Sequence, residues 1–486
     1  MSKTLVRTLA SLMLLSLLAA ACGQKEGVHV GFNDSGAGDG GAMADPGESG
    51  DAGFDDDGAV AGDGFDDGSG TSADGSGDDG STGAAGGGGS DISGGGTGGS
   101  GDAGGGTGGS GGGGTSGGGG AGGGGAGGAG DMTGVTDTTI KIGLHAPLSG
   151  AAPLPQQSFV VGKDQYWKHI GKVFGRNVEV VVRDDQYNPS RATSVCNDLI
   201  QREKVYMLIG GGGTDQITAC ARTAQKQGVP YLSAGVDEGL LRSIPNYFAL
   251  SMSYIQQAPL LIQWVKKNSP PPNNKFGIVR DRTPGFNGVV AKMKQLAEAQ
   301  GWEVLVRQTQ NGPSDASWLT QNQIKVAFPI MAPSTFIQIV RSPGGSIDQW
   351  AGIGITMGLN TVANAACQGN AAYSGSMFFS PAPGLNVMPQ VDPEFAKAGG
   401  EDDIHLLLWG VNKSIHGVFQ KMSANDVSRQ AFMRAFENNV IQSGVYPVIK
   451  HTAQNHFGAQ DVNVLVADCA KAQYVTPPDG LHRSSF

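Results

Sequence analysis

Short β-rich runs alternate regularly with longer amphipathic stretches from Thr139 onward. A strand followed by a helix and then another strand requires a crossover connection, which produces a parallel sheet with helices on both faces. The first runs are TIKIGLHAP (139–147), VEVVVRDD (178–185), VYMLIGG (205–211) and VPYLSAG (229–235), with helices expected near 158–170, 189–203 and 214–227. The sequence therefore predicts an α/β fold.

After a strand at 247–252 and a helix near 256–268, the pattern starts again. Strands are expected at 275–281, 302–308, 324–332, 350–356 and 371–380, with helices at 285–300 and 335–341. Two helices (403–421 and 427–438) and a late strand (462–468) follow. This length suits two Rossmann-like lobes joined by a hinge. We expect lobe 1 at about 135–255, lobe 2 at about 270–400, and a C-terminal segment that recrosses the hinge, so that 135–486 form one ligand-binding domain.

Residues 1–21 have the pattern of a secretory signal: a basic start, a short apolar run and a small-residue exit. The run is too short to span a membrane. It ends at Cys22 in LLAAAC, which resembles the lipobox of bacterial lipoproteins, although Ala19 stands where Leu is more usual. A plain signal with an incidental cysteine is the alternative. The prediction is an exported cell-envelope lipoprotein, held by a lipid on Cys22 at the extracytoplasmic side of a bacterial membrane.

Residues 22–134 consist mainly of Gly, Ser, Ala and Asp. Such a segment lacks the apolar surface needed to offset its ordering entropy, so it is expected to be a disordered linker. It carries 18 of the 43 acidic residues and a single lysine, a net charge of -17 against -10 for the whole chain. The remaining chain is mildly basic without a clustered basic stripe, and nucleic acid is therefore not an expected partner.

Four cysteines remain beyond Cys22. An even number in an exported chain suggests two disulfides, with three possible connectivities, or else four buried thiols. With a strand order of 2-1-3-4, right-handed crossovers make the 189–203 and 214–227 helices neighbours on one face. This predicts a Cys196–Cys220 disulfide and leaves Cys367–Cys469 as the other.

The glycine run GGGGTDQ (210–216) lacks the G-K-[ST] ending of a phosphate-binding loop and does not fit GxGxxG. There is no GxSxG or HExxH motif. His451 and His456 lie in a loop-like region without a third ligand, which favours surface histidines over a metal site. We therefore expect no enzyme activity, no cofactor and no metal.

Three segments carry a resemblance to a known family: GVTDTTIKIGLHAPLSGAAP (134–153), VEVVVRDDQYNPSRA (178–192) and LIGGGGTDQITACARTAQKQGVPYLSAG (208–235). In order and spacing they resemble the branched-chain amino-acid-type (leucine-binding, type I) periplasmic binding proteins of ABC importers. The resemblance covers nearly all of 135–486 and weakens after about Asn311. It implies two lobes that close on a small ligand by hinge bending.

Ligands of open α/β sheets bind beyond the carboxyl ends of strands. That rule points to the loops that contain Ser149, Gly213, Thr214, Ser233, Gly235 and Asp237. The resemblance implies that Thr214, at a helix start, holds a ligand carboxylate; the alternative is a helix cap only. Asp237 stands near a position where the family usually has Thr, and is either a contact or an exposed helix cap.

For lobe 2 the resemblance implies ligand contacts near Phe286, Ala332 and Thr356. The acidic residue that often receives an amino group has no clear counterpart in GIGITMGLN (352–360), which argues against a leucine-like amino acid. The predicted function is a receptor that delivers a small polar or amphipathic ligand (an amino acid, an amide or a small organic acid) to an ABC permease. A ligand sensor of the same fold and a surface-projected interaction protein are the alternatives.

Overall fold

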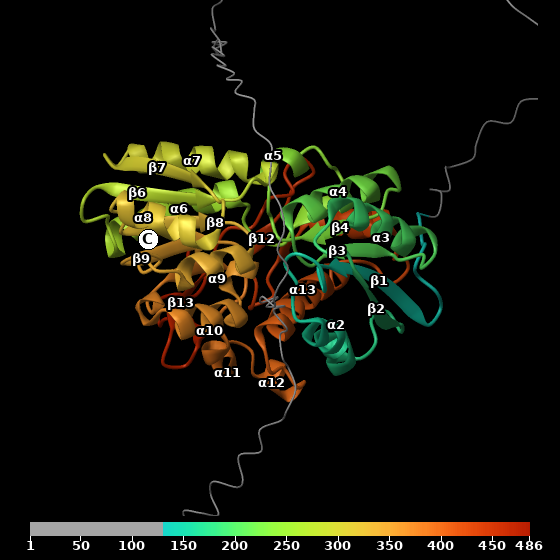
Figure 1. Ribbon diagram of the computed structural model, residues 1–486. Coiled ribbons are helices and arrows are strands. Elements are labelled where there is room, and N and C mark those ends of the chain that lie inside the picture. The colour runs from blue at the N-terminus through green and yellow to red at the C-terminus, as the bar shows by residue number, and fades with distance from the viewer. Residues whose placement is uncertain (1–129) are drawn as a thin grey trace, which may run out of the picture. The chain divides into compact units, whose positions relative to one another are not determined.

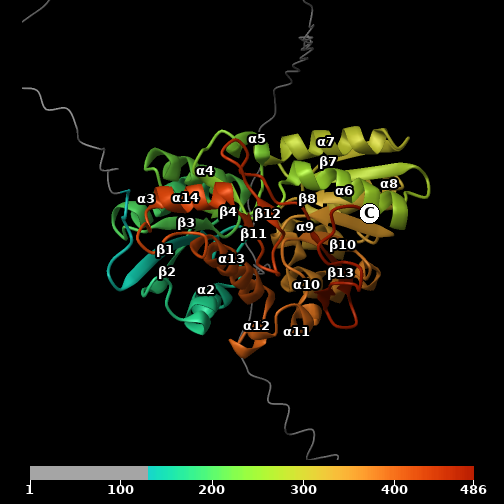
Figure 2. The same cartoon turned by 180° about the vertical axis from the view of Figure 1, so that it is seen from behind.

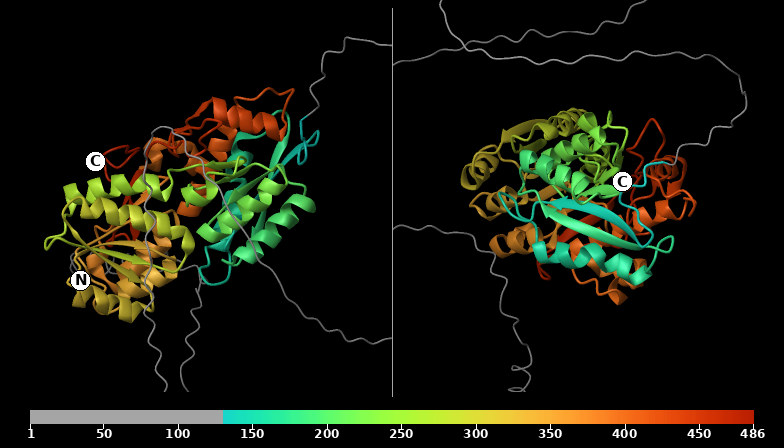
Figure 3. Two further views of the ribbon diagram at one scale, coloured as in Figure 1. Left: turned by 90° about the horizontal axis from the view of Figure 1, so that it is seen from above. Right: turned by 90° about the vertical axis from the view of Figure 1, so that its right-hand side faces the viewer.

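The computed structural model describes residues 130–486, which lie within one compact unit of the chain. The predicted signal peptide, Cys22 and nearly all of the predicted linker lie outside the described residues. The described chain forms two lobes, each built on its own sheet (Figure 1), with helices on both faces of each sheet (Figure 3). The predicted α/β class with two lobes is confirmed.

Lobe 1 contains a five-stranded parallel sheet in the order β2-β1-β3-β4-β5. Its first elements are β1 (Thr139–Ala146), α2 (Gln156–Ile170), β2 (Asn177–Asp184), α3 (Pro189–Gln201), β3 (Met207–Gly210), α4 (Thr214–Lys226), β4 (Tyr231–Ser233), α5 (Glu238–Leu241) and β5 (Tyr247–Ala249). The chain returns to this lobe with α13 (Asp403–Phe419), α14 (Arg429–Asn438), β11 (Val440–Ile441) and β12 (Ile449–Lys450), as Figure 2 shows.

Lobe 2 contains a seven-stranded sheet in the order β14-β13-β10-β9-β8-β6-β7, in which β13 is antiparallel to both of its neighbours. Its elements begin with α6 (Tyr254–Asn268), β6 (Lys275–Arg280), η1 (Pro284–Phe286), α7 (Asn287–Glu298), β7 (Glu303–Gln308), α8 (Gly312–Gln321), β8 (Val326–Ile330), α9 (Pro333–Arg341), β9 (Gln349–Ile353), η2 (Thr356–Gly358) and α10 (Asn360–Gly369). They continue with η3 (Ala371–Tyr373), β10 (Met377–Ser380), β13 (Asn463–Asp468) and β14 (Gln473–Val475). The connection back to α13 holds η4 (Leu385–Val387), α11 (Met388–Val391) and α12 (Pro393–Lys397).

Strand β1 shows why these runs become central strands. Ile140, Ile142 and Leu144 are fully buried in the core that includes α2 residues. Gly143 faces the opposite side, where an added Cβ would come within 2.8 Å of Leu208 Cδ2. A strand that is buried on both faces needs a nearly continuous apolar sequence, and the glycine allows close packing.

Two sequence expectations in lobe 2 differ from the structure. No helix was expected between the strands at 302–308 and 324–332, but α8 lies there, with the Asn311 side chain accepting a hydrogen bond from the Ser314 N–H (2.9 Å). The strand expected at 371–380 begins only at Met377, because η3 occupies its first residues. In both places local capping and turn chemistry decide the conformation.

His451 and His456 are not surface residues. Both are buried, and the His456 ring stacks on Phe248 with the ring centroids 4.1 Å apart. Burial, together with the nearby His456 ring, lowers the pKa of His451 to about 3. The pair therefore belongs to the aromatic core of lobe 1.

The structure forms both disulfides that the sequence predicts, Cys196–Cys220 between α3 and α4 and Cys367–Cys469 between α10 and the end of β13. The first pair is buried between two helices that lie side by side on one face of the lobe 1 sheet (Figure 1). The observed strand order begins β2-β1-β3-β4, so the crossover argument gives the correct pairing.

The start of the described chain is attached to lobe 1 through Arg429, which is 3% exposed. Its guanidinium donates to Asp131 Oδ2 (2.6 Å), to the Tyr206 carbonyl (2.9 Å) and to the Val205 carbonyl (2.6 Å). The Lys141 N–H in turn donates to the Gly134 carbonyl (2.8 Å). Among the described residues, Asp131 is thus the first that hydrogen-bonds to the body of lobe 1.

Candidate functional site

A cleft with an empty volume of about 750 Å³ lies between the two lobes. The carboxyl ends of strands meet there from both sides, β3 and β4 from lobe 1 and β8 and β9 from lobe 2. The lining residues are Pro147, Ala152, Leu154, Tyr187, Gly210–Gly213, Thr214, Ile217, Ala234, Val236, Tyr254, Phe286, Ile330, Met331, Pro333, Ile353–Ile355, Thr356 and Met357. None of these residues carries a charge.

The glycine run forms the lobe 1 wall and leads directly into α4. The Gly211 N–H donates to the His145 carbonyl (2.7 Å), and the Ile217 N–H donates to the Gly213 carbonyl (2.9 Å). Within residues 130–486, the N–H groups of Gly212, Gly213 and Thr214 have no hydrogen-bond acceptor. Free N–H groups and the helix dipole together favour an anion at this point.

Glycine is required at these positions for different local reasons. At Gly210 the space for a Cβ is taken by the Tyr231 hydroxyl, and at Gly211 a Cβ would lie 2.8 Å from the His145 carbonyl oxygen. Gly213 has a φ of 78°, which side chains rarely allow. The run therefore combines close backbone approach with a sharp turn into the helix.

A buried polar network supports the glycine run from beneath. The Asp185 carboxylate accepts a hydrogen bond from His145 Nδ1 (2.7 Å), and His145 Nε2 accepts one from the Tyr231 hydroxyl (2.7 Å). The Tyr187 N–H also donates to Asp185 (3.0 Å), which places Tyr187 at the cleft. Satisfied buried networks of this kind fix one local geometry.

The lobes touch at Thr214. Tyr254, at the start of α6, lines the cleft together with Thr214, and burial raises the pKa of Tyr254 to about 12. A Cβ added to Gly285, in η1, would overlap Thr214 Cγ2. This part of the interface is therefore closed to within van der Waals contact.

Carboxylates lie beside this contact but outside the lining. Burial raises the pKa of Asp215, and the charges of Asp281 and Asp237 raise it further. Burial also raises the pKa of Asp237, while hydrogen bonds from the N–H groups of Gly239 and Leu240 lower it. Asp237 caps α5 by accepting from the Gly239 N–H (3.0 Å), and it is buried rather than exposed.

Four of the nine residues expected to contact a ligand line the cleft: Gly213, Thr214, Phe286 and Thr356. The other five do not line it. Ser149 is exposed and donates a hydrogen bond to Asp184 (2.5 Å). The N–H of Gly235 donates to the Ser251 hydroxyl (3.1 Å). Ser233 is buried, and its hydroxyl is hydrogen-bonded with that of Tyr247. Asp237 is the α5 cap described above, and Ala332 lies between the lining residues Met331 and Pro333. Ligand contact by any of the nine stays a prediction.

Several lining residues were missed by the sequence analysis. Tyr187 follows β2, so the rule about carboxyl ends of strands would have found it. Tyr254 follows the connection between the lobes, and no motif marks it. Leu154 reaches the cleft from the loop before α2.

A metal site is not supported by the part of the chain that the structure describes. The one group of three potential ligands there is His145, Cys196 and Cys220, and the two cysteines are joined in a disulfide. Such sulfur atoms do not supply the thiolates that metals bind.

A smaller cavity of about 320 Å³ contains Asp403, the first residue of α13. Asp403 Oδ2 accepts a hydrogen bond from the N–H of Asn360 (2.5 Å), the first residue of α10, so this contact joins the two lobes. Burial raises the pKa of Asp403 to about 6 from its ordinary 3.8, although the Asn360 N–H acts in the opposite direction.

Asp403→Asn is expected to reduce the loss of stability on going from pH 4 to pH 7. Because the folded pKa is the higher one, the folded chain holds a proton that the unfolded chain releases, and stability falls as the pH rises from about 4 to 6. At about 1.4 kcal/mol per pKa unit, the variant should remove ~2 kcal/mol of the fall between pH 4 and pH 7, since the unfolded carboxyl is already partly ionised at pH 4. Urea unfolding at both pH values measures it, with the exposed Asp137→Asn as control; equal pH dependence in Asp403→Asn and the unmodified chain would contradict the prediction.

Comparisons with known proteins agree with this geometry. A family model described as periplasmic binding protein matches residues 139–473. No curated protein sequence matches the chain.

Similar solved structures share the fold at low sequence identity. A fatty acid ABC transporter substrate-binding protein from Thermomonospora curvata has a TM-score of 0.61 at 17% identity, covering 73% of this chain and 95% of its own. A leucine binding protein from Thermotoga maritima has a TM-score of 0.58 at 15% identity, and the match covers 70% of this chain and 100% of that protein. A solute binding protein of an ABC transporter from Rhodopseudomonas palustris, in complex with p-hydroxybenzoic acid, has a TM-score of 0.57 at 18% identity. The match covers 71% of this chain and 96% of that protein.

Proposed function

Because this chain belongs to the periplasmic binding protein family, we propose that it is an extracytoplasmic receptor that binds a small organic acid and delivers it to an ABC importer. The observation that carries the proposal is the group of free N–H donors at Gly212, Gly213 and Thr214, which open into an apolar cleft between the lobes. A carboxylate accepts such hydrogen bonds well, and the helix dipole adds to them.

The lobe 2 wall favours an organic acid over an amino acid. Its lining residues, Phe286, Ile330, Met331, Pro333, Ile353–Ile355, Thr356 and Met357, include no carboxylate that could receive an ammonium group. An ammonium group buried without a partner is costly. The ligands for which the three similar proteins are named or with which they are complexed, a fatty acid, leucine and p-hydroxybenzoic acid, all carry a carboxylate.

The extracytoplasmic location follows from the family and suits the chemistry of the fold. Two disulfides are typical of exported proteins. No helix within 130–486 is long and apolar enough to cross a membrane. We propose that attachment to the membrane depends on a lipid at Cys22, as the lipobox-like LLAAAC suggests.

The ligand class is tested by thermal shift of the purified full-length chain with hexanoate, hexanol, hexylamine, leucine and benzoate. We expect the acids without an amino group to raise the melting temperature, since a ligand that binds only the folded state stabilises it. Stabilisation by hexylamine or leucine but not by hexanoate or benzoate would contradict an organic-acid receptor. Recovery of a membrane permease on the immobilised, ligand-loaded chain tests the importer step.

Thr214→Ala is expected to weaken binding of the stabilising acid by about 10- to 100-fold, the range for one hydrogen bond to a charged group. Thr223→Ala, on the same helix and with its hydroxyl bonded to the Ala219 carbonyl (3.0 Å), serves as the matched control. Isothermal titration calorimetry measures both. Equal affinities in Thr214→Ala and Thr223→Ala would exclude Thr214 as the contact for the carboxylate.

A further inference from the structure

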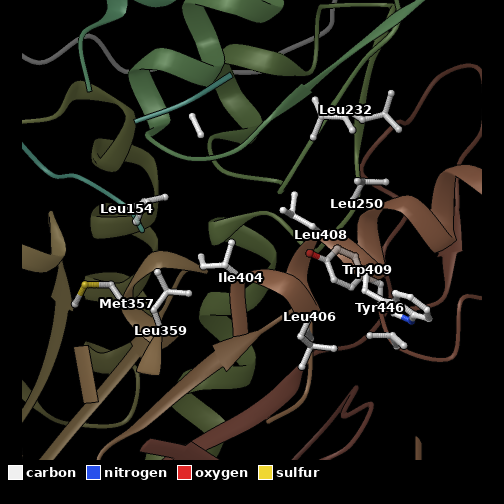
Figure 4. Close-up of a cluster of buried hydrophobic side chains, with 14 of the residues drawn as sticks. Leu154, Leu232, Leu250, Met357, Leu359, Ile404, Leu406, Leu408, Trp409 and Tyr446 are labelled. Carbon is white, nitrogen blue, oxygen red and sulfur yellow. The ribbon is translucent and has the colours of Figure 1, made fainter. Parts of the chain in front are cut away.

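A second cavity of about 540 Å³ adjoins the cleft and extends toward α13. The two cavities share lining residues, among them Gly210, Gly211 and Thr356, so one space continues into the other. We call the second cavity the inner chamber. Leu154, Leu250, Leu359, Ile404, Leu408 and Tyr446 belong to its wall, and Figure 4 shows them contributed by both lobes and by α13.

The wall of the inner chamber is almost entirely apolar. The Ser233 hydroxyl already donates to the Ala234 carbonyl (2.8 Å), and the Tyr446 hydroxyl donates to the Leu407 carbonyl (3.0 Å). The remaining polar side chain, Thr356, lies where the chamber joins the cleft. Cavities lined in this way favour apolar groups over water.

Helix α13 contributes two half-buried apolar residues to the chamber wall. Leu407 and Val411 are one turn apart and only half-buried, whereas Ile404 and Leu408 beside them are buried. Both half-buried residues line the chamber. Their free apolar surface would be covered by a molecule that enters it.

The shared boundary determines the shape of what can enter. The glycines Gly210 and Gly211 form part of it, and they add no side chain to the space. The free N–H groups of Gly212, Gly213 and Thr214 follow immediately. A molecule with its carboxylate at these donors can therefore extend a thin, flexible substituent past the glycines into the chamber.

We propose that the inner chamber holds the alkyl chain of a straight-chain monocarboxylic acid whose carboxylate lies at Gly212–Thr214. This rests on the proposed function and specifies its substrate class. Each methylene placed in the chamber leaves water for an apolar wall, which corresponds to about a four-fold gain in affinity per methylene. The gain ends when the chamber is full, because overpacking then opposes longer chains.

The test is calorimetric titration of the delipidated full-length chain with butanoate, hexanoate, octanoate, decanoate and dodecanoate. We expect the affinity to rise about four-fold with each added methylene, up to a limiting chain length of the acid. Val411→Phe fills part of the chamber and should shorten that limit, with a larger loss of affinity for octanoate than for butanoate. Val161→Phe makes the same substitution on α2, where the side chain is 41% exposed, and should change nothing.

Three results would overturn the proposal in distinguishable ways. If affinity does not depend on chain length but still depends on Thr214, the chamber assignment fails and the organic-acid receptor stands. If benzoate binds more tightly than every straight-chain acid and is unaffected by Val411→Phe, the occupant is a ring in the outer cleft. If no acid binds, both proposals fail. The chain-length series on the unmodified chain decides these points even if Val411→Phe does not fold.

Discussion

Gly285→Leu is expected to hold the two lobes apart. Gly285 lies in η1 of lobe 2, and a Cβ at this position would overlap Thr214 Cγ2 of lobe 1. The larger leucine side chain increases the overlap only in the closed arrangement, so it changes the balance between closed and open states. A shift from 99% closed to 99% open changes the equilibrium constant between the two states by about 10⁴-fold, which is ~5.5 kcal/mol. We expect Gly285→Leu to change this equilibrium by a similar amount.

Two measurements test this variant without knowledge of the ligand. Small-angle X-ray scattering should give a larger radius of gyration for Gly285→Leu, and spin labels on the two lobes should report a longer distance. Gly288→Leu is the matched control, since a Cβ there lies 3.1 Å from Ile255 of the same lobe and faces no residue of lobe 1. A variant that stays closed like the control would show that the Thr214–Gly285 contact does not limit closure.

Replacing Cys367 and Cys469 with alanine is expected to destabilise the chain by about 4 to 5 kcal/mol. The disulfide joins residues 102 positions apart. Cross-linking a loop of about 100 residues lowers the entropy of the unfolded chain, which stabilises the folded state by about 4 to 5 kcal/mol. It fastens α10 to the end of β13, a strand that enters lobe 2 only after the chain has visited lobe 1. Loss of this link therefore affects the last strands of lobe 2 most.

Urea unfolding under non-reducing conditions measures this effect. The double substitution of Cys196 and Cys220 provides the comparison, because a loop of 24 residues predicts a smaller entropic loss of about 3.5 kcal/mol. Hydrogen exchange should show faster opening of β13 and β14 in the first variant and of α3 and α4 in the second. Identical stability of the Cys367/Cys469 variant and the unmodified chain would refute the entropic argument.

The resemblance to branched-chain amino-acid-type periplasmic binding proteins is confirmed by the family match and the fold. The central strands were predictable because strands buried on both faces, such as β3, require continuous apolar runs. Helix α8 was missed because polar residues dominate its sequence, although Asn311 and Pro313 at its start provided a capping signal.

Part of the cleft was predictable, because some of its residues follow from the local order of elements along the chain. The position of Thr214 follows from local order, a strand, a glycine turn and a helix start. The inner chamber does not, since α13 reaches lobe 1 only after the whole of lobe 2 has been traversed. Contacts between segments so far apart in sequence depend on packing that no local pattern encodes.

The ion pair between Asp131 and Arg429 fixes the start of the described chain to lobe 1. The segment that leads to the N-terminus joins the body beside β1 and α14, both in lobe 1. A pull on that segment is transmitted to the buried guanidinium and the backbone of Val205 and Tyr206, and it bypasses the connections between the lobes. Lobe 1 would therefore take up such a pull, and the position of lobe 2 relative to lobe 1 would not depend on it.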